Sequence, residues 1–449
     1  MLRVPKIVKT TGEVKEESQP AHHEVVSPLQ ANFNSETTVG KVVLDFFDPE
    51  ITDITVDAPP GSGKTTALVT AVKHIVTMSE AQIMIITPTR TQVTELVGRL
   101  LQVLPASAID IDLNQKADVS PLMALLSTKK REEAQNEMAK AVAVPGHVSV
   151  STVSRMTMRS NRVAQYRCLI VDEAYQVTYG DYSLVSGCAH KHIMVGDPGQ
   201  IGPVVTAPQQ LWSSFHHTNP TRRLQDVTRT SSLKTSHYSI NETWRLGPMT
   251  TDVVKTLYDF DFESKRPPVE VTLDGKPVSE IEVVDVHTPL ARSKPDSTDS
   301  IRLMRLVARR VAEFLDSGYI TIHGKREKIT AKDIAIVAAY NYQVEEAILV
   351  LRSQYGGKSP VEVLTADRAQ GKEWRIVLAI DPACIPGGAA AHTFSTGRLA
   401  VMLSRHSGHL TWYGVHSEEI VDSYDVDLIT QSGLDVRDML YEYPVIAEM

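Results

Sequence analysis

Apolar residues in this chain gather in short continuous runs, which are separated by polar turns and by longer stretches with helical spacing. The first series of runs comprises Ile54–Ala58, Gln82–Thr87, Cys168–Asp172 and His192–Gly196. Between them, Gly63–Met78 and Thr91–Leu104 have the spacing of helices. Continuous apolar strands followed by helices are typical of a parallel sheet that is buried on both faces. We therefore predict an α/β domain that begins at about Val39.

A second series of the same kind follows later in the chain. It comprises Ile281–Val286, Asp333–Ala338, Pro360–Thr365, Arg375–Ile380 and His409–Gly414. The polar stretch Thr218–Ser239 lies between the two series and predicts a junction between domains. We therefore predict a first domain over residues 39–232 and a second over residues 233–449.

Two further segments depart from this pattern. Residues 1–38 are polar, with mixed charge and few aromatic side chains, which predicts a flexible N-terminal tail. The charged segment Lys129–Lys140 predicts a solvated helix, because runs of charge usually face water. We place this helix in a small insertion in the first domain, at about residues 106–146.

Composition narrows the class of protein. No stretch of the sequence approaches the roughly 18 consecutive apolar residues of a membrane span, and the N-terminus lacks the apolar segment of a signal peptide. The three cysteines form no C-x-x-C pair, which argues against a disulfide framework or a structural zinc site. A reducing compartment fits best, so we expect the protein to be cytoplasmic (in the host cytoplasm if it is viral).

Ala58-Pro-Pro-Gly-Ser-Gly-Lys-Thr65 has the spacing of a phosphate-binding P-loop, between a predicted strand and a predicted helix. Its glycines let backbone N–H groups surround phosphates, and the N-terminus of the helix adds partial positive charge. Lys64 is expected to reach the β- and γ-phosphates, and the Thr65 hydroxyl to bind Mg²⁺. The predicted nucleotide-binding residues here are Ala58, Pro59, Pro60, Gly61, Ser62, Gly63, Lys64, Thr65 and Thr66.

An acidic pair ends another apolar run, Leu169-Ile-Val-Asp172-Glu173. Open α/β sheets bind ligands beyond the carboxyl ends of their strands, so both carboxylates are candidates for the nucleotide site. Asp172 is expected to bind Mg²⁺, and Glu173 to orient and polarise the attacking water. The alternative is a buried strand that ends in an acidic turn without function.

Further motifs make a resemblance to one family specific. Val195–Ile201, with Gln200, resembles motif III of superfamily 1 helicases, and Pro88–Gln92 resembles motif Ia. In the second half, Asn241–Pro248 is similar to motif IV. Tyr340-x-x-Gln343, Thr365–Glu373 and Arg398–His406 resemble the Tyr-x-x-Gln element of nonsense-decay helicases, motif V and motif VI. Together the motifs follow the family's order, and the resemblance is greatest to the 5′-to-3′ branch that includes nonsense-decay and nidovirus-type helicases.

The resemblance implies two tandem RecA-like P-loop NTPase domains with parallel sheets, and hydrolysis in the cleft between them. The catalytic residues that it implies are Glu173, Lys64, Arg245, Arg405 and Gln200, and it adds Trp244, Gly371 and Glu373 to the nucleotide site. Arginine suits closure onto a phosphate because its planar group binds two oxygens and stays charged. A surface or interdomain salt bridge is the alternative for either arginine taken alone.

Nucleic-acid contacts are the least specific part of the resemblance. The candidates are Thr89, Arg90, Thr152 and Arg368. A threonine at the end of a strand more often caps a helix, and the insertion around Lys129–Lys140 could form a strand-gripping subdomain instead of a plain solvated helix. The net charge of −8 argues against a basic coat over the whole surface. It allows a short strand in one groove, because charges act within a Debye length of about 8–10 Å.

Some positions depart from the family pattern. Thr37 stands where the family has a glutamine that recognises adenine, so other NTPs could replace ATP. Trp244 stands where a tyrosine is usual, and either stacking on the base or a place in the core explains it. Ser404-Arg405-His406 is similar to the form found in alphavirus-like helicases, which favours a virus, phage or mobile element as the source.

We therefore predict an Mg²⁺-dependent NTPase, using ATP or another NTP, that acts as a monomeric helicase or translocase on single-stranded DNA or RNA. Replication-complex proteins are possible partners. A nucleic-acid clamp or remodeller that hydrolyses NTP without unwinding keeps every motif and stays open as the alternative. A small-molecule kinase has no need of the second sheet domain, Gln200 or Arg405.

Overall fold

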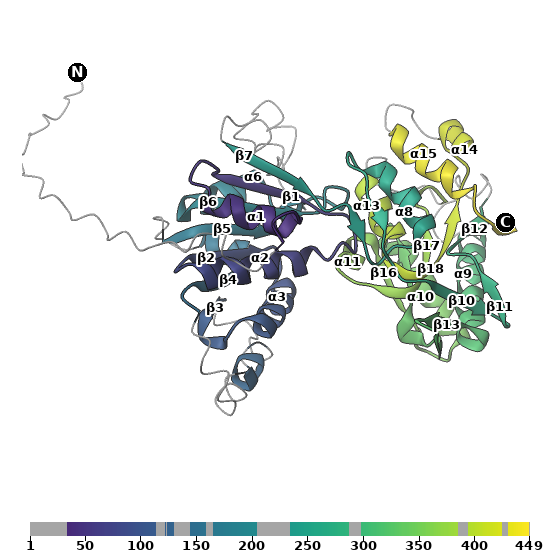
Figure 1. Cartoon of the computed structure of the whole chain (residues 1–449). Helices are drawn as coiled ribbons and strands as arrows, with labels where there is room; N and C mark the ends of the chain where they lie inside the picture. The colour runs from purple at the N-terminus through teal and green to yellow at the C-terminus, as the bar shows by residue number, and fades with distance from the viewer. Residues whose placement is uncertain are drawn as a thin grey trace, which may run out of the picture.

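The computed structural model of the chain forms two lobes, each built around one large sheet (Figure 1). The described residues are 34–113, 122, 124–129, 144–158, 165–203, 234–286, 298–384, 394–423 and 430–448. Most of the predicted N-terminal tail and most of the predicted insertion, including Lys129–Lys140 beyond its first residue, lie outside the described residues. Within the described residues, no helix is long and apolar enough to cross a membrane.

The sheet of the first domain has seven parallel strands in the order β3-β4-β2-β5-β6-β1-β7. Its strands are β1 (Asp53–Asp57), β2 (Gln82–Thr87), β3 (Ile109–Asp112), β4 (His147–Thr152), β5 (Tyr166–Asp172), β6 (Ala189–Gly196) and β7 (Thr235–Ser239). Its helices are α1 (Thr38–Phe47), α2 (Lys64–Met78), α3 (Arg90–Val103), α5 (Val153–Thr157) and α6 (Tyr179–Val185).

Successive residues of β2 enter two different cores, as the continuous apolar run predicts. Ile83 and Ile85 pack in the core beneath α1, α2 and α3. Met84 and Ile86 pack in the core beneath α5 and α6 on the opposite face. All four side chains have no exposed surface, so the strand is buried on both faces.

The first sheet extends beyond the boundary that we predicted between residues 232 and 233. β7 pairs in parallel with β1, with Asp53 opposite Thr235 and Asp57 opposite Ser239. This strand lies at the edge of the sheet, and all its residues keep some exposure. Its sequence is polar because no second core covers it, so hydrophobic patterning assigned it to the junction.

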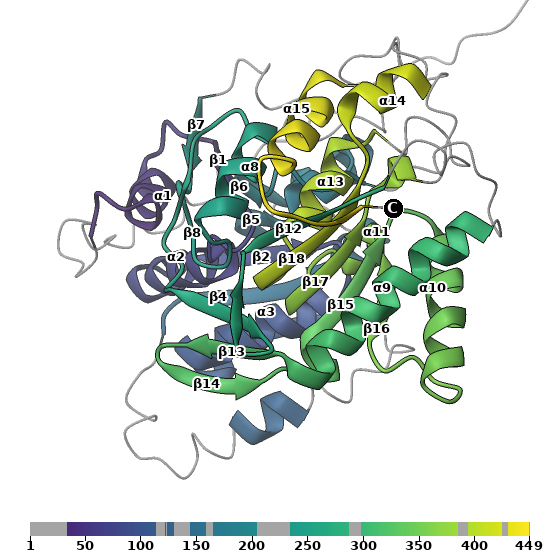
Figure 2. The same cartoon turned by 90° about the vertical axis from the view of Figure 1, so that its right-hand side faces the viewer.

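The second domain contains a sheet of six parallel strands in the order β16-β15-β17-β18-β12-β19 (Figure 2). Its strands are β12 (Ile281–Asp285), β15 (Ile334–Ala338), β16 (Glu362–Thr365), β17 (Trp374–Ile380), β18 (His406–Gly414) and β19 (Val445–Glu448). Its helices are α8 (Pro248–Val254), α9 (Thr298–Ser317), α10 (Asn341–Gln354), α11 (Ala366–Ala369), α13 (Thr396–Leu403), α14 (Ser417–Ser423) and α15 (Gln431–Leu440). The fold is thus α/β, with two tandem RecA-like domains and a parallel sheet in each.

An antiparallel sheet that we did not predict flanks the second domain. Its strand order is β11-β10-β13-β14, from β10 (Val269–Leu273), β11 (Lys276–Val278), β13 (Tyr319–Ile322) and β14 (Lys325–Lys328). Two tight hairpins build it, because Asp274-Gly275 and His323-Gly324 all adopt positive φ angles, as two-residue hairpin turns require. A two-stranded sheet pairs β8 (Glu242–Thr243) with β9 (Glu263–Ser264).

Candidate active site

The P-loop joins the end of β1 to the start of α2. Gly61 and Gly63 have φ angles of 72° and 77°, a left-handed conformation that glycine adopts without steric cost. Gly63 caps α2 without a side-chain hydrogen bond, so the first N–H groups of the helix are available to an anion. The Ser62 hydroxyl is buried and has no hydrogen-bond partner within the described part of the chain. These features form a cradle for phosphate.

The acidic pair lies beside this cradle at the end of β5. Lys64 Nζ and Glu173 Oε1 are 2.5 Å apart, and the Glu173 N–H donates to Asp172 Oδ1 at 3.0 Å. Glu173 has a φ of 56°, which is uncommon for a residue with a side chain and recurs at functional sites. Burial raises the pKa of Asp172 to about 6, although the Lys64 charge opposes this rise.

Lys64 is held charged by these carboxylates. Burial lowers its pKa and is the largest single influence, but Glu173 and Asp172 together outweigh it, so the pKa rises above 10.5. The lysine therefore keeps a full positive charge at the P-loop at any physiological pH. Such a charge is what the β- and γ-phosphates of a nucleotide require.

The loop after β6 supplies a third carboxylate and a glutamine. Gln200 Nε2 donates to Asp197 Oδ2 at 2.5 Å, and Gly199 N donates to Asp197 Oδ1 at 3.1 Å. Burial raises the pKa of Asp197 to about 6, while a hydrogen bond from Tyr258 and the Lys64 charge lower it. Asp197 therefore orients Gln200 at the edge of the P-loop.

Two arginines reach the site from the second domain. Arg245 Nε donates to Glu373 Oε2 at 2.6 Å, and a Cβ placed on Gly61 would overlap Arg245 Cβ. Arg405 is 1% exposed. Its terminal nitrogens donate to Ser404 Oγ at 3.0 Å and to the Lys372 carbonyl at 3.4 Å. Its Nε has no partner among the described residues.

Arg405 carries a charge that the nearby carboxylates of Asp197 and Glu173 only partly compensate. Burial, and then the positive charge of Arg245, lowers its pKa from 12.5 to about 10. It remains a cation at neutral pH, beside a second cation and facing the P-loop. An anion in the pocket would therefore be stabilised by both arginines.

Residues of both domains line one pocket, with a volume of about 170 Å³. Of the predicted residues, those that line it are Ala58, Pro59, Pro60, Gly61, Ser62, Gly63, Lys64, Thr65, Asp172, Glu173, Gln200, Arg245, Gly371 and Arg405. The structure thus brings every predicted catalytic residue to a single pocket between the two domains. The Thr65 hydroxyl, the Asp172 carboxylate and the unpartnered Ser62 hydroxyl are oxygen groups of the kind that bind Mg²⁺ and phosphate.

Three predicted nucleotide residues lie outside the lining of this pocket. Thr66 is exposed and accepts a hydrogen bond from Arg99 at 3.2 Å. Glu373 pairs with Arg245. Trp244 is 57% exposed, and its backbone N–H donates to the Gly61 carbonyl at 2.9 Å. The interpretation of Trp244 as a core residue is therefore wrong, because more than half of its surface is exposed.

Sequence reasoning missed the contribution of α3 to this pocket. Gln92, Glu95, Leu96 and Arg99 line it. The available signal was the Thr89–Gln92 capping box, which fixes where α3 begins after β2. We used that segment only to propose nucleic-acid contacts.

The threonines proposed for nucleic-acid contact have local structural roles. Thr89 caps α3, and its hydroxyl accepts from Gln92 N at 3.3 Å. Thr152 is 4% exposed and caps α5, where it accepts from Arg155 N at 3.3 Å. Arg90 and Arg368 are exposed, so their side chains are accessible to a ligand. Thr37, at the position of the expected adenine-binding glutamine, caps α1 through Gly40 N at 3.1 Å and does not line the pocket.

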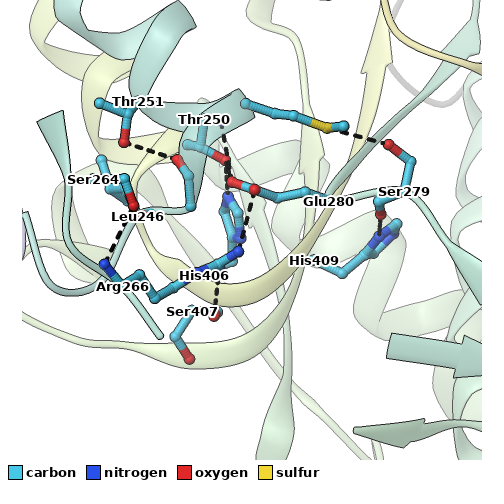
Figure 3. A network of polar contacts seen from close by, with 12 residues as sticks. Leu246, Thr250, Thr251, Ser264, Arg266, Ser279, Glu280, His406, Ser407 and His409 are labelled. Atoms are coloured by element: carbon cyan, nitrogen blue, oxygen red, sulfur yellow. Dashed lines mark hydrogen bonds and ion pairs between the residues drawn. The ribbon is translucent and has the colours of Figure 1, made fainter. Parts of the chain in front are cut away.

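A polar network around His406, the residue that follows Arg405, joins β18 to α8, the helix that follows Arg245 (Figure 3). Glu280 accepts from the Thr250 backbone and hydroxyl and from Arg266, at 3.1, 2.5 and 3.1 Å. Because the Thr250 hydroxyl donates to Glu280, it accepts from His406 Nε2 at 3.0 Å. Burial lowers the pKa of His406 well below 6.5, so it adds no charge next to Arg405.

Comparisons with known proteins identify related domains in both halves of the chain. Residues 50–206 match one family model described as an AAA domain, and residues 253–414 match a second with the same description. A Danio rerio protein named "Putative helicase mov-10-B.1" is 22% identical over 380 residues, which are 78% of this chain and 37% of that protein. The chain thus spans little more than a third of that relative's length.

Two solved helicase structures are also similar in part. One is titled "Complex structure of Arterivirus nonstructural protein 10 (helicase) with DNA", with a TM-score of 0.41, 15% identity and coverage of 81% of this chain and 61% of that one. The other is "The structure of PRRSV helicase", with a TM-score of 0.42, 13% identity and coverage of 84% and 53%. The two AAA-domain matches cover most of the strands of both large sheets, and the ordered motifs meet in one pocket. The chain is thus an NTP-hydrolysing enzyme that resembles superfamily 1 helicases, including their nonsense-decay-type and viral members.

Proposed function

We propose that this protein is a motor that hydrolyses NTP in the pocket between its two domains and moves along single-stranded nucleic acid. The observation that carries the proposal is Arg405, a buried cation from the second domain that lines the same pocket as the P-loop and Glu173. Hydrolysis that needs this arginine requires the domains to be closed. A site that is complete only when two domains meet can link each hydrolysis event to domain motion.

The chemistry follows from the side chains. The P-loop amides and Lys64 hold the phosphates, and Glu173 orients the attacking water. Thr65 and Asp172 would hold Mg²⁺, which neutralises phosphate charge when it is bound. Arg245 and Arg405 stabilise the negative charge that develops on the transferred phosphoryl group.

Base recognition is expected to be loose. Thr37 is used as a helix cap and does not line the pocket. The exposed Trp244 ring lies one residue from Arg245 and can stack on any base. The proposal is therefore ATP hydrolysis with other NTPs accepted, rather than strict selection of adenine.

The proposed nucleic-acid substrate and direction of movement are supported by the sequence motifs. Their order and form support 5′-to-3′ movement on single-stranded DNA or RNA, and the Danio rerio relative is named as a helicase. The Ser404-Arg405-His406 form supports a role in nucleic-acid processing in a virus, phage or mobile element. Exposed Arg90 and Arg368 are the side chains that we propose for phosphate contact.

One experiment tests these points together. The protein is incubated with Mg²⁺ and ATP or GTP, and with duplexes of DNA or RNA that carry a 5′ tail, a 3′ tail or no tail. We expect strand separation on 5′-tailed duplexes, and hydrolysis that rises with single-stranded nucleic acid. Stimulated hydrolysis without strand separation would show a clamp or remodeller instead. Hydrolysis that ignores every nucleic acid would exclude the motor.

A further inference from the structure

One side chain of the second domain contacts the loop that carries Gln200 and lies outside every motif described above. The hydroxyl of Tyr258 donates to Asp197 Oδ1 at 2.7 Å. Gly199 N donates to the same oxygen at 3.1 Å, and Gln200 Nε2 donates to Oδ2 at 2.5 Å. Asp197 therefore gathers three donors, two from its own loop and one from the other domain.

The packing around Tyr258 fixes the direction of its hydroxyl. A Cβ placed on Gly199 would overlap the Tyr258 ring, so the ring lies directly against the backbone of the loop. On its other sides the ring meets Phe260 at 5.5 Å and Phe262 at 5.2 Å between centroids, both edge to face. Burial raises the pKa of Tyr258 well above 10, so its hydroxyl stays protonated and donates.

Tyr258 lies in the same short segment of the second domain as Arg245. The chain runs from Arg245 into α8, through a short 3₁₀ turn at Lys255–Leu257, and then to Tyr258. This one segment meets the first domain twice, with Arg245 against Gly61 of the P-loop and Tyr258 against Gly199. Movement of the second domain therefore changes both contacts together.

We propose that Tyr258 is a positioning residue that transmits domain closure to Gln200 through Asp197. The inference rests on the proposed function and deepens it. When the domains are closed, the Tyr258 hydroxyl fixes one carboxylate oxygen of Asp197, and the other oxygen holds the Gln200 amide in place. When the second domain moves away, Asp197 loses that donor and Gln200 loses its fixed orientation. The position of the second domain then affects the pocket through the orientation of Gln200 as well as through the two arginines.

The test uses the full chain and compares Tyr258→Phe with wild type. This change keeps the ring that packs on Gly199 and removes only the hydroxyl. Because hydrogen bonds to a carboxylate are among the stronger ones, we expect the hydrolysis rate stimulated by single-stranded nucleic acid to fall about tenfold. The KM for ATP should stay within about twofold, because the phosphate cradle is intact. A residue that only supported the fold would not give this separation of kcat from KM.

Two further variants test whether Tyr258 acts on Gln200 through Asp197. In an Asp197→Asn background, adding Tyr258→Phe should lower the rate by less than about twofold, because the two residues act through one contact. Tyr441→Phe is the matched control, since Tyr441 donates to Asp285 Oδ1 at 2.8 Å within the second domain, away from the pocket. It should leave the stimulated rate unchanged.

The outcomes separate the two proposals. A wild-type protein whose hydrolysis ignores nucleic acid refutes the motor, and with it the coupling role of Tyr258. A stimulated wild type with an equally fast Tyr258→Phe variant refutes only the inference. Full additivity of Tyr258→Phe and Asp197→Asn would also overturn it. A lower melting temperature of Tyr258→Phe, without any change in kcat, would show a purely structural tyrosine.

Discussion

Replacing Arg405 with alanine is the perturbation that bears most directly on the pocket. The side chain is buried and lies close enough to Arg245 for the two charges to repel. Its Nε finds no partner within the described part of the chain. Alanine removes this charge and leaves the P-loop, Lys64 and Glu173 untouched. We expect NTP to bind nearly as well and hydrolysis to fail.

The structure sets the size of the effect. Burial and then the Arg245 charge lower the pKa of Arg405 from 12.5 to about 10. At 1.36 kcal/mol for each pKa unit, keeping this arginine charged costs about 3 kcal/mol. Negative charge that develops in the pocket during hydrolysis stabilises the charged arginine and offsets this cost. A stabilisation of about 3 kcal/mol in the transition state corresponds to roughly a 100-fold change in rate. We therefore expect kcat to fall at least about 100-fold, with KM changed by less than about threefold.

The assay is steady-state hydrolysis with saturating single-stranded nucleic acid, measured for Arg405→Ala, Arg405→Lys and wild type. Lysine has a lower ordinary pKa than arginine, so the same surroundings should bring it within the assay range. The lysine variant should then lose activity from pH 7 to pH 9 relative to wild type. Arg309→Ala, at an exposed position of α9, is the control. A kcat of wild-type size in Arg405→Ala, or a change confined to KM, would refute the reasoning.

Three further predictions follow from other parts of the structure. Glu173→Gln should retain NTP binding and lose hydrolysis by more than about 100-fold, and a binding titration that fails would contradict this. Trp244→Ala should raise the KM for ATP and GTP to a similar extent, about fivefold, and a loss confined to ATP would show adenine selection instead. Burial lowers the pKa of His409 to about 3 and that of His406 well below 6.5. At these two histidines the unfolded chain binds protons first as the pH falls, so they lower the stability in denaturant unfolding by about 3 kcal/mol between pH 7.5 and pH 5.5. The raised pKa values of Asp172 and Asp197 offset part of this loss, so a smaller net fall is expected. A stability that does not fall would show that these histidines are charged in the folded state.

The strands that were predicted from continuous apolar runs agree best with the structure. β2 begins and ends at the residues predicted for it, and β5 extends the predicted run Cys168–Asp172 by two residues at its start. Such strands are buried on both faces, so their composition is set by the two cores that they separate. Their ends therefore located the acidic pair and the P-loop as well.

Elements without a continuous apolar core were missed for the opposite reason. β7 is a polar strand at a sheet edge, and its place is decided by backbone pairing with β1. The hairpin between β10 and β11 was indicated only by Asp274-Gly275, a turn signal without an apolar run of its own. In both cases main-chain hydrogen bonds, rather than side-chain burial, determine the structure.

The residues of the pocket also divide into those that the sequence predicts and those that it does not. Glycines, Lys64 and the arginines could be identified because the chemistry of phosphate dictates their type and spacing. Tyr258 and Glu95 could not, because their roles depend on which surfaces of α3 and the second domain come together. Nothing in the local sequence around Tyr258 specifies Asp197, 61 positions away, as its partner.

We expect hydrolysis to occur only where residues of both domains meet on a nucleic-acid-bound protein. The most direct measurement is the rate of ATP hydrolysis with Mg²⁺, with and without single-stranded RNA or DNA, for wild type and Arg405→Ala side by side. We predict a rate that rises at least about tenfold on addition of nucleic acid in wild type and does not rise in the variant. Equal rates with and without nucleic acid in wild type, or full stimulation in Arg405→Ala, would contradict the account.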